Sequence, residues 1–439
     1  MKRTSAWYAL GLMLMIILTT SACGRLKKDG TVEPPPHPPA AGLSIPAEGS
    51  LPTATPSPSS TDEMSLLWWT VPDHAPVTGP SSEAAAILAQ QIADFGMQTT
   101  DGAIRVVVKK PFGKGGILDF LHTASAAAPS VLPDVVTIHS SELPIAVQSG
   151  LIQPLPAELA ADLSSDFFPF ARSIAEVGGS LYGIAWDADM EHVAFDARTL
   201  AATPSRWDEV LESDVRWAIP MGGNEGRVGN SILLQYMSAG GTLSDPVDIA
   251  ALTRLLQFLD RGRRSGTIPD VALSLPNLDA CWQALARGDV NMAEVKASRY
   301  LSQRADVPWA QPAASPTWDG TPITIGEGWI LAIVTPDPER QRMALEFIRY
   351  LTTAERMAAW TAASHYLPAR RSAFKFYRAP KEDGYPAFAA SLLEAAVALP
   401  PGELPATLSR PLQTAVRQVL RGDAIPEEII ANLRVEVGP

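Results

Sequence analysis

Three acidic side chains alternate along one short stretch of the chain, as Asp187, Asp189 and Glu191. Carboxylates at such a spacing bind divalent cations in some proteins and hydrolyse glycosidic bonds in others. On a strand, however, every second side chain points to the same face, and like charges there are typical of a solvated face or a cleft rim. His192 has no His or Cys neighbour at the spacing of zinc ligands. We therefore predict no metal site and no catalytic residue.

Two other motifs of enzymes are incomplete or missing. The segment P-F-G-K-G-G at 111–116 is rich in glycine but lacks the Gly-Lys-Ser/Thr ending of a P-loop. The sequence contains no G-x-S-x-G elbow of a serine hydrolase. We expect no cofactor and no covalent chemistry.

Aromatic residues beside polar ones point instead to binding. Sugar rings are recognised by flat aromatic faces together with fixed polar groups for the hydroxyls. Trp68 and Trp69 end the first predicted strand, Trp186 precedes Asp187, and Trp329 follows G-E-G at 326–328. We predict that these five side chains bind a ligand. Core packing is the alternative for Trp186 and Trp329, and only one of Trp68 and Trp69 can face the ligand, because neighbours on a strand point to opposite faces.

Length and composition limit the class of protein. The chain has 439 residues, of which 46% are hydrophobic, so it can form two or three domains with buried cores. A formal net charge of −12 argues against binding nucleic acid through its phosphates. Two cysteines exclude a disulfide-rich scaffold.

The N-terminus is typical of an export signal. Lys2 and Arg3 precede an apolar run at 6–18, which would span roughly 20 Å as a helix and fall short of a ~30 Å hydrocarbon core. Residues 1–22 are therefore predicted to be a signal peptide rather than a transmembrane helix. The run T-S-A-C-G at 20–24 resembles a bacterial lipobox, which implies a lipid anchor at Cys23 and an extracytoplasmic, membrane-attached protein. An ordinary signal peptide with an incidental cysteine is the alternative.

A proline-rich segment follows the signal. Residues 23–62 contain nine prolines and little apolar mass, so we predict a disordered tether. A proline-rich docking motif is the alternative. Cys281 would then be a lone cysteine, which we expect in the core of a helix at 278–287.

The folded part is predicted to begin near residue 64 and to be of the α/β class. Apolar segments separated by amphipathic ones predict strands and helices in alternation. Because the strands are continuously apolar, we expect a parallel sheet covered on both faces. The predicted strands are 65–70, 104–108, 134–138, 290–295 and 321–334, and the predicted helices are 82–98, 117–128, 140–149, 278–287 and one that Asp337 and Pro338 begin.

Seven short motifs follow one another along the chain. They are P-D-V-V-T-I (133–138), G-L-I-Q-P-L (150–155), L-Y-G-I-A-W (181–186), P-S-R-W-D-E-V-L (204–211), R-G-D-V-N-M (287–292), G-E-G-W-I-L-A-I (326–333) and L-P-A-R (367–370). The set resembles family 1 of the bacterial extracellular solute-binding proteins, the maltose-binding-protein-like lipoproteins of ABC importers. Two positions depart from the family pattern, with Ala185 where Pro is common and Phe195-Asp196 where Tyr-Asn is common.

The resemblance implies a two-lobed periplasmic-binding-protein-like fold of type II with a ligand cleft between the lobes. Lobe 1 would comprise 64–190 and 325–375, and lobe 2 would comprise 191–324 and 376–439. A monomer of this kind would capture a small solute, a carbohydrate in many relatives, close by a hinge motion and deliver the solute to a permease. The resemblance also implies that Glu294 and Arg299 face the cleft, with a solvated turn as the alternative.

Several further residues have weaker claims on the site. Ser140 and Ser141 end the third strand and either contact the ligand or cap the next helix, whereas Trp207 is expected in the core. Tyr236 and Tyr366 are further candidates.

Two other functions remain open from the sequence. A surface-anchored enzyme acting on glycans would place a pair of buried carboxylates across one groove. A binding component of a sensory system would share the receptor's fold.

Overall fold

The computed structural model describes residues 65–76, 82–99, 103–159, 165–221, 228–243, 246–380, 382–400, 404 and 406–437. The predicted signal peptide and tether, including Cys23, lie outside these residues. None of the helices in the described ranges is long and apolar enough to cross a bilayer.

Four strands from the first half of the chain and one from the second half, β12, form a five-stranded sheet in the order β2-β1-β3-β12-β6. β1 pairs in parallel with β2 and with β3, as the sequence predicts, but β12 pairs antiparallel with both β3 and β6. The expectation of a parallel sheet is therefore wrong for β12, whereas β6 runs in the same direction as β1, β2 and β3. β12 follows directly from the second sheet, so no helical crossover sets its direction. The strands are β1 (Leu66–Thr70), β2 (Ile104–Val108), β3 (Val135–His139), β6 (Gly183–Ala185) and β12 (Trp329–Ile333).

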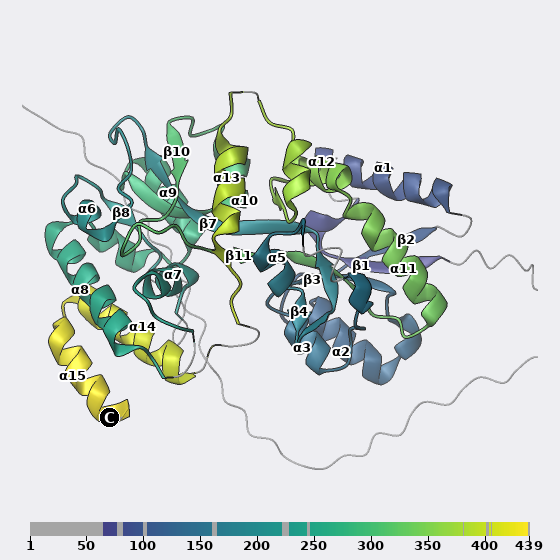
Figure 1. Cartoon of the computed structure of the whole chain (residues 1–439), viewed down its shortest axis with the longest axis horizontal. Helices are drawn as coiled ribbons and strands as arrows, with labels where there is room; N and C mark the ends of the chain where they lie inside the picture. The colour runs from purple at the N-terminus through teal and green to yellow at the C-terminus, as the bar shows by residue number, and fades with distance from the viewer. Residues whose placement is uncertain are drawn as a thin grey trace, which may run out of the picture. The chain divides into compact units, whose positions relative to one another are not determined.

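Helices cover both faces of this sheet (Figure 1), which makes it an α/β layer. The helix from Asp337 begins as predicted, because the Asp337 side chain accepts hydrogen bonds from two backbone amides and Pro338 fills the first turn. The predicted helix at 140–149 starts later, at Leu143, because β3 extends to His139. The helices are α1 (Glu83–Gln98), α2 (Ile117–Ala127), α3 (Leu143–Gln148), α5 (Pro169–Ser173), α11 (Pro338–Leu351) and α12 (Ala354–Ser364).

A second, seven-stranded sheet is built around one long strand, β7. Its main order is β14-β11-β7-β9-β8, and β10 and β13 also pair with β7. The strands are β7 (Asp187–Asp196), β8 (Trp217–Ala218), β9 (Met292–Lys296), β10 (Ala310–Ala313), β11 (Thr324–Glu327), β13 (Leu367–Pro368) and β14 (Ala396–Val397). A separate hairpin pairs β4 (Glu176–Val177) with β5 (Ser180–Leu181).

The helices of the second half pack around this sheet, and the C-terminal helices α14 and α15 contact α8 (Figure 1). They are α6 (Trp207–Leu211), α7 (Asn230–Ser238), α8 (Ile249–Ser265), α9 (Leu278–Arg287), α10 (Ala297–Gln303), α13 (Tyr385–Glu394), α14 (Ala406–Arg421) and α15 (Pro426–Val437). One hydrophobic core cluster consists of side chains from the first sheet and its helices and extends to β7 and α9. The other joins β8, α7 and α8 to the C-terminal helices.

The chain changes sheet three times, once through α11 and α12 between β12 and β13 and twice by direct crossings from strand to strand, which contact each other. The chain passes from β6 to β7 at Trp186 and from β11 to β12 at Gly328, so the predicted strand region 321–334 is two strands. The Trp186 amide donates to the Trp329 carbonyl at 2.8 Å, and the Trp329 amide donates to Asp187 Oδ1 at 2.8 Å. A Cβ atom on Gly328 would lie 2.3 Å from the Asp187 carbonyl oxygen, closer than atoms can approach.

We therefore expect Gly328→Ala to force the two crossings apart and to lower the free energy of unfolding by about 2 kcal/mol or more. Gly384→Ala is the matched control, because a Cβ there meets no atom within 4 Å, and it should change that free energy by about 1 kcal/mol at most. Urea unfolding of both variants measures the difference. Equal effects would show that the contact between the crossings is not tight.

Candidate functional site

A cleft of about 830 Å³ opens where the crossings meet. Its walls come from both sheets: the turn after β1, the end of β3 and the β11–β12 crossing on one side, and α9, α10 and the end of β9 on the other. It therefore lies at the carboxyl ends of β1 and β3, the edge where open α/β sheets bind ligands.

A second chamber of about 490 Å³ adjoins the first. Asp279 and Lys296 line both chambers, which places these two side chains at the boundary. The smaller chamber is further lined by Glu191, by the N-terminal ends of α7 and α9, and by Arg417 of α14.

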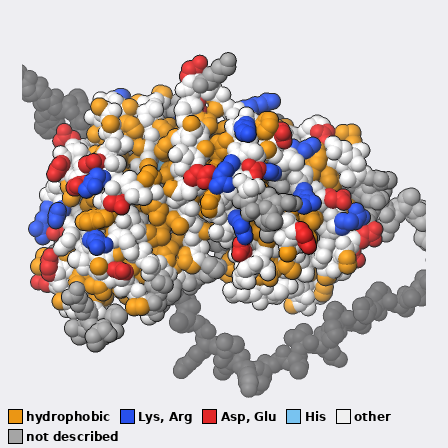
Figure 2. Space-filling view, viewed as in Figure 1, with side chains coloured by type: hydrophobic (Ala, Val, Ile, Leu, Met, Phe, Trp, Pro, Cys, Tyr) orange, Lys and Arg blue, Asp and Glu red, His pale blue; other side chains and the backbone are white. Residues whose placement is uncertain are grey.

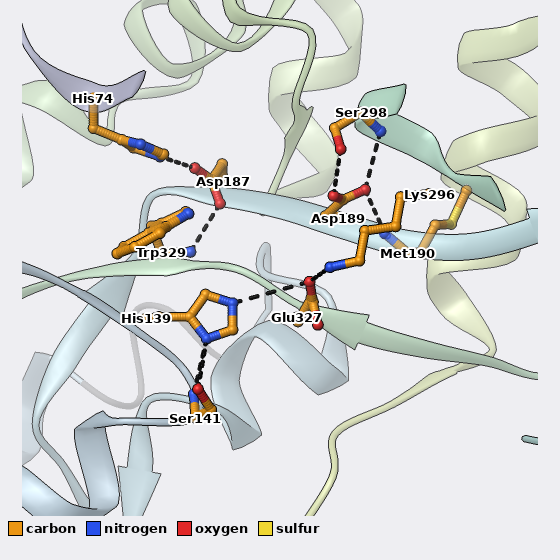
Figure 3. A network of polar contacts seen from close by, with 10 residues as sticks. All are labelled: His74, His139, Ser141, Asp187, Asp189, Met190, Lys296, Ser298, Glu327 and Trp329. Atoms are coloured by element: carbon orange, nitrogen blue, oxygen red, sulfur yellow. Dashed lines mark hydrogen bonds and ion pairs between the residues drawn. The ribbon is translucent and has the colours of Figure 1, made fainter. Parts of the chain in front are cut away.

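A partly buried ion pair lies at the boundary between the chambers (Figure 3). Lys296 Nζ contacts Glu327 Oε1, and His139 Nε2 lies 3.9 Å from the same oxygen. Burial alone would raise the pKa of Glu327, but the charges of Lys296 and His139 outweigh it and lower the pKa. Burial likewise opposes the charge of Lys296, whereas Glu327 and Asp189 more than compensate and raise its pKa. Both groups of the pair are therefore charged at neutral pH.

Asp189 reaches the cleft from β7 and is held by hydrogen bonds (Figure 3). Its Oδ1 accepts from the amides of Ser298 and Met190, both at 3.0 Å, and its Oδ2 accepts from the Ser298 hydroxyl at 2.6 Å. Burial raises the pKa of Asp189 to about 6, against the opposing charge of Lys296. Burial therefore makes the ionised carboxylate of Asp189 costly.

Asp187 connects the cleft to a buried aromatic cluster. His74 Nε2 lies 2.5 Å from Asp187 Oδ2, and both side chains are fully buried. The His74 ring centroid lies 4.9–5.5 Å from those of four surrounding rings, which belong to Trp186, Trp329, Trp360 and Tyr366. Because its other carboxylate oxygen accepts from the Trp329 amide, Asp187 has a fixed orientation.

An aromatic surface lines one wall of the larger chamber. Trp329 packs with Phe112 and His139, at ring-centroid distances of 5.6 and 5.1 Å. Phe112 is 48% exposed, and Tyr366 also lines the wall. Aromatic faces and buried charges therefore meet in one cavity.

The cleft brings together two of the predicted ligand-binding residues, Asp187 and Trp329. Trp68, Trp69 and Trp186 are buried in the first core cluster and line neither chamber. Their contacts there are with other core groups: Trp68 Nε1 donates to Thr137 Oγ1 at 2.9 Å, Trp186 stacks on Trp360 at 4.1 Å, and Trp69 packs edge-on against Phe120.

Glu294 also lies away from both chambers. It is fully buried in β9 and accepts a hydrogen bond from the Ser315 hydroxyl at 2.8 Å, so its interpretation as a solvated turn is wrong. Burial, with a further contribution from the charge of Glu191, raises the pKa of Glu294 to about 8. Burial also raises the pKa of Glu191 to about 7, against the hydrogen bond from Ser231.

The alternating acids of β7 are at most 5% exposed, so the interpretation of a solvated face is wrong. Asp187 and Asp189 line the larger chamber, whereas Glu191 lines the smaller one. Within the described ranges, no group of three or more His, Cys, Asp or Glu side chains is placed to hold a metal ion.

The remaining candidates divide between the cleft and the core. Arg299 and Tyr366 line the larger chamber, whereas Tyr236 and Trp207 are buried in the second core cluster. Ser141 caps no helix and contacts His139 Nδ1 at 2.8 Å. Cys281 is a buried free thiol, as predicted.

Sequence reasoning missed Phe112, His139 and Lys296 as cleft residues. Phe112 lies in the P-F-G-K-G-G segment, which was considered only as a phosphate loop. Gly113 and Gly115 adopt positive φ in this loop, and Phe112 beside them lines the cleft. An aromatic residue next to closely spaced glycines was therefore the sequence feature that could have predicted a ligand-binding loop.

The burial of Glu294 leads to a pH prediction. Because its pKa is raised in the folded state, its favourable contribution is complete below its ordinary pKa and is lost as the pH rises toward about 8. Glu294→Gln cannot ionise, so we expect the variant to be more stable than the parent at pH 8, by on the order of 2 kcal/mol, and to lose this advantage at pH 5. Thermal unfolding across this range, with the exposed Glu212→Gln as control, measures the effect. An unchanged pH dependence would contradict it.

Comparisons with known proteins agree with this geometry. A family model described as bacterial extracellular solute-binding protein matches residues 90–389. No curated protein sequence matches the chain.

Solved structures of sugar-binding proteins share the fold. The sugar-binding protein MalE from Xanthomonas citri is 20% identical, with 85% of this chain and 96% of that chain covered and a TM-score of 0.65. Maltodextrin-binding protein MalE1 from L. casei BL23 is 13% identical, with coverages of 85% and 97% and a TM-score of 0.66. Maltose-bound MalE3 of T. maritima is 18% identical, with coverages of 85% and 98% and a TM-score of 0.61.

Proposed function

This chain belongs to the bacterial extracellular solute-binding protein family, and we propose from this that it captures a carbohydrate in its cleft and delivers it to the permease of an ABC importer. The observation that carries the proposal is the larger chamber, where an aromatic wall faces buried groups with fixed hydrogen bonds. That combination suits a sugar ring, which has apolar faces and an edge of hydroxyls.

The proposed contacts follow from the lining of the chamber. Trp329 and Phe112 offer ring faces, and Asp187, Lys296 and Arg299 offer acceptors and donors for hydroxyls. The similar structures include a maltose-bound protein and a maltodextrin-binding protein, which supports the same class of ligand here. Of the residues predicted from the sequence, we propose that Asp187 and Trp329 contact the ligand, while the buried members of the set hold the framework: Trp68, Trp69, Trp186 and Glu294.

Closure on the ligand would occur at the two crossings. The changes of sheet at Trp186 and Gly328 lie within a few residues of the boundaries that the sequence predicts for two lobes, at 190 and 325. We propose that the lobes divide there and rotate about the crossings, so that the permease can sense the closed form.

The alternative of a glycan-acting enzyme has less support. Asp187 and Glu327 are each bound to another group, His74 and Lys296 respectively, and neither is free to act as acid or nucleophile. Figure 2 shows acidic and basic side chains interspersed over the face that it draws, with no basic patch suited to nucleic acid. We propose a monomeric binding protein without catalytic activity; a sensory role for the same fold would require a different partner.

The direct test is calorimetry of the protein from residue 62 onward with mono- and oligosaccharides, polyols, amino acids and phosphate esters. Binding of a sugar without its consumption supports the receptor. Consumption of the sugar would identify an enzyme, and binding of none of the sugars would overturn the proposed function.

Phe112 provides a variant that probes the aromatic wall without disturbing the core. We expect Phe112→Ala to weaken binding of the sugar by roughly 3- to 10-fold, because one stacking contact contributes about 0.5–1.5 kcal/mol. Trp318→Ala is the matched control, since Trp318 is similarly exposed, at 45% against 48%, and lines neither chamber. Calorimetry measures both affinities, and an equal loss in the two variants would contradict the role of Phe112.

We also propose that Cys23 is lipidated and anchors the protein outside the cytoplasm. Cys23→Ala should then move the full-length protein from the membrane fraction to the soluble fraction, because the acyl chains provide the attachment. Fractionation of expressing bacteria measures this, and Cys281→Ala is the control. Retention of the Cys23 variant in the membrane would identify another anchor.

A further inference from the structure

The larger chamber has an excess of negative charge. Five carboxylates line it, against two basic side chains, Lys296 and Arg299. The carboxylates belong to Asp73, Asp187, Asp189, Asp279 and Glu327. If both histidines of the wall are neutral, the lining has a surplus of three negative charges, which falls to two if His74, the partner of Asp187, is protonated.

Both histidines of the wall favour the neutral state. Burial lowers the pKa of His139, although the charge of Glu327 partly opposes this effect. Burial and, to a smaller degree, the charge of Arg304 lower the pKa of His365. Neither imidazole therefore offsets the carboxylates at neutral pH.

The surplus resides in three particular carboxylates. Glu327 is paired with Lys296, and Asp279 with Arg299, whose Nε and Nη2 lie 2.7 and 2.8 Å from its two oxygens. Among the described residues, no Lys or Arg forms an ion pair with the other three, which are Asp73, Asp187 and Asp189.

Two of these carboxylates lie next to the aromatic wall. Asp187 and Asp189 are two positions apart on β7 and both line the chamber, so their carboxylates are separated by roughly 7 Å along the strand. Asp187 has one hydrogen-bond partner at each oxygen and Asp189 accepts three hydrogen bonds in all, which leaves lone pairs for a further donor. Trp329 and Tyr366 line the same chamber, and aromatic rings of this kind attract cations to their faces.

From this arrangement we propose that the carbohydrate carries a protonated amine, whose ammonium group binds at Asp187 and Asp189 beside Trp329. The proposal rests on the proposed function and narrows it to amine-bearing saccharides. An ammonium group has three donors and one positive charge, so it satisfies the spare acceptors and reduces the surplus of negative charge. A neutral sugar would leave that surplus in place, and an acidic sugar would increase it.

The cost of keeping Asp189 ionised supports this inference. Burial raises the pKa of Asp189 to about 6 even though the positive charge of Lys296 opposes this rise. The negative charges of Glu327 on β11 and of Glu191 on β7 act in the same direction as burial. Lys296 is already bound to Glu327. A cationic ligand would supply the charge that the protein does not.

The test compares five disaccharides on two scaffolds by calorimetry at neutral pH. The β-1,4-linked set consists of the disaccharide of glucosamine, its N-acetylated form and cellobiose. The α-1,4-linked pair consists of the 2-amino disaccharide and maltose. We expect the amine to bind about tenfold more tightly than its neutral counterpart, and this preference to fall as salt rises from 50 to 500 mM.

Asp189→Asn should reduce the ratio of amine to neutral affinity by about tenfold. Asp306→Asn removes one negative charge from an exposed site outside the chambers and should leave the ratio unchanged. Thermal unfolding confirms that each variant is folded, and Ser298→Ala, which removes only one hydrogen bond to Asp189, should retain the preference if Asp189→Asn does not fold.

The outcomes separate this inference from the proposed function. Equal or tighter binding of the neutral sugars would overturn the amine but keep the carbohydrate receptor. If the protein binds neither kind of sugar but does bind a simple diamine such as putrescine, the proposed function is overturned. A preference for the amine that Asp189→Asn leaves intact would overturn the assigned carboxylates.

Discussion

The carboxylate of Asp187 connects the parts of this molecule that must act together. One oxygen accepts the Trp329 amide of the second crossing, and the other contacts the buried His74. Its own backbone carbonyl leaves no room for a side chain on Gly328. The position of Trp329, and with it the aromatic wall of the cleft, therefore depends on contacts at the place where both crossings change sheets. A shift at the crossings would move the ligand-contacting groups directly, without an intermediate element.

Much of the fold could be predicted from local sequence, because its elements are set by local rules. The helix after Asp337 has a side-chain cap and a first-turn proline, and β2 is a β-branched run interrupted only by Arg105, with the predicted bounds. The direction of β12 could not be predicted in this way. It follows from Gly328, where the chain enters the first sheet from the second, and no pattern within 329–333 records that connection.

The site was predicted less well, since burial in the folded chain decides which side chains reach the cleft. Trp68 and Trp329 both follow patterns that suit an aromatic platform, yet Trp68 is enclosed between Trp186 and Phe347. Phe112, by contrast, projects from a loop whose glycines have no periodicity. Lys296 becomes a cleft residue because β9 and β11 flank β7, and its side chain reaches Glu327 across that strand, which is a long-range contact. The composition shows that the chain has many aromatic and acidic residues, but it does not show which of them lie together in the cleft.

The carboxylates of β7 show how stability and binding are related in this cleft. A carboxylate with a raised pKa is one whose ionised form the folded state disfavours, and Asp189 is such a group while lining the larger chamber. Glu294 is disfavoured in the same way but lies out of reach of any ligand in either chamber. A ligand that stabilises the ionised form of Asp189 would recover part of the cost of burial as affinity, whereas no ligand in the cleft can directly recover the cost at Glu294. Burial therefore imposes the same kind of cost on both acids, but the consequences differ. At Asp189 the cost favours a particular ligand, whereas at Glu294 it only makes the stability of the fold depend on pH.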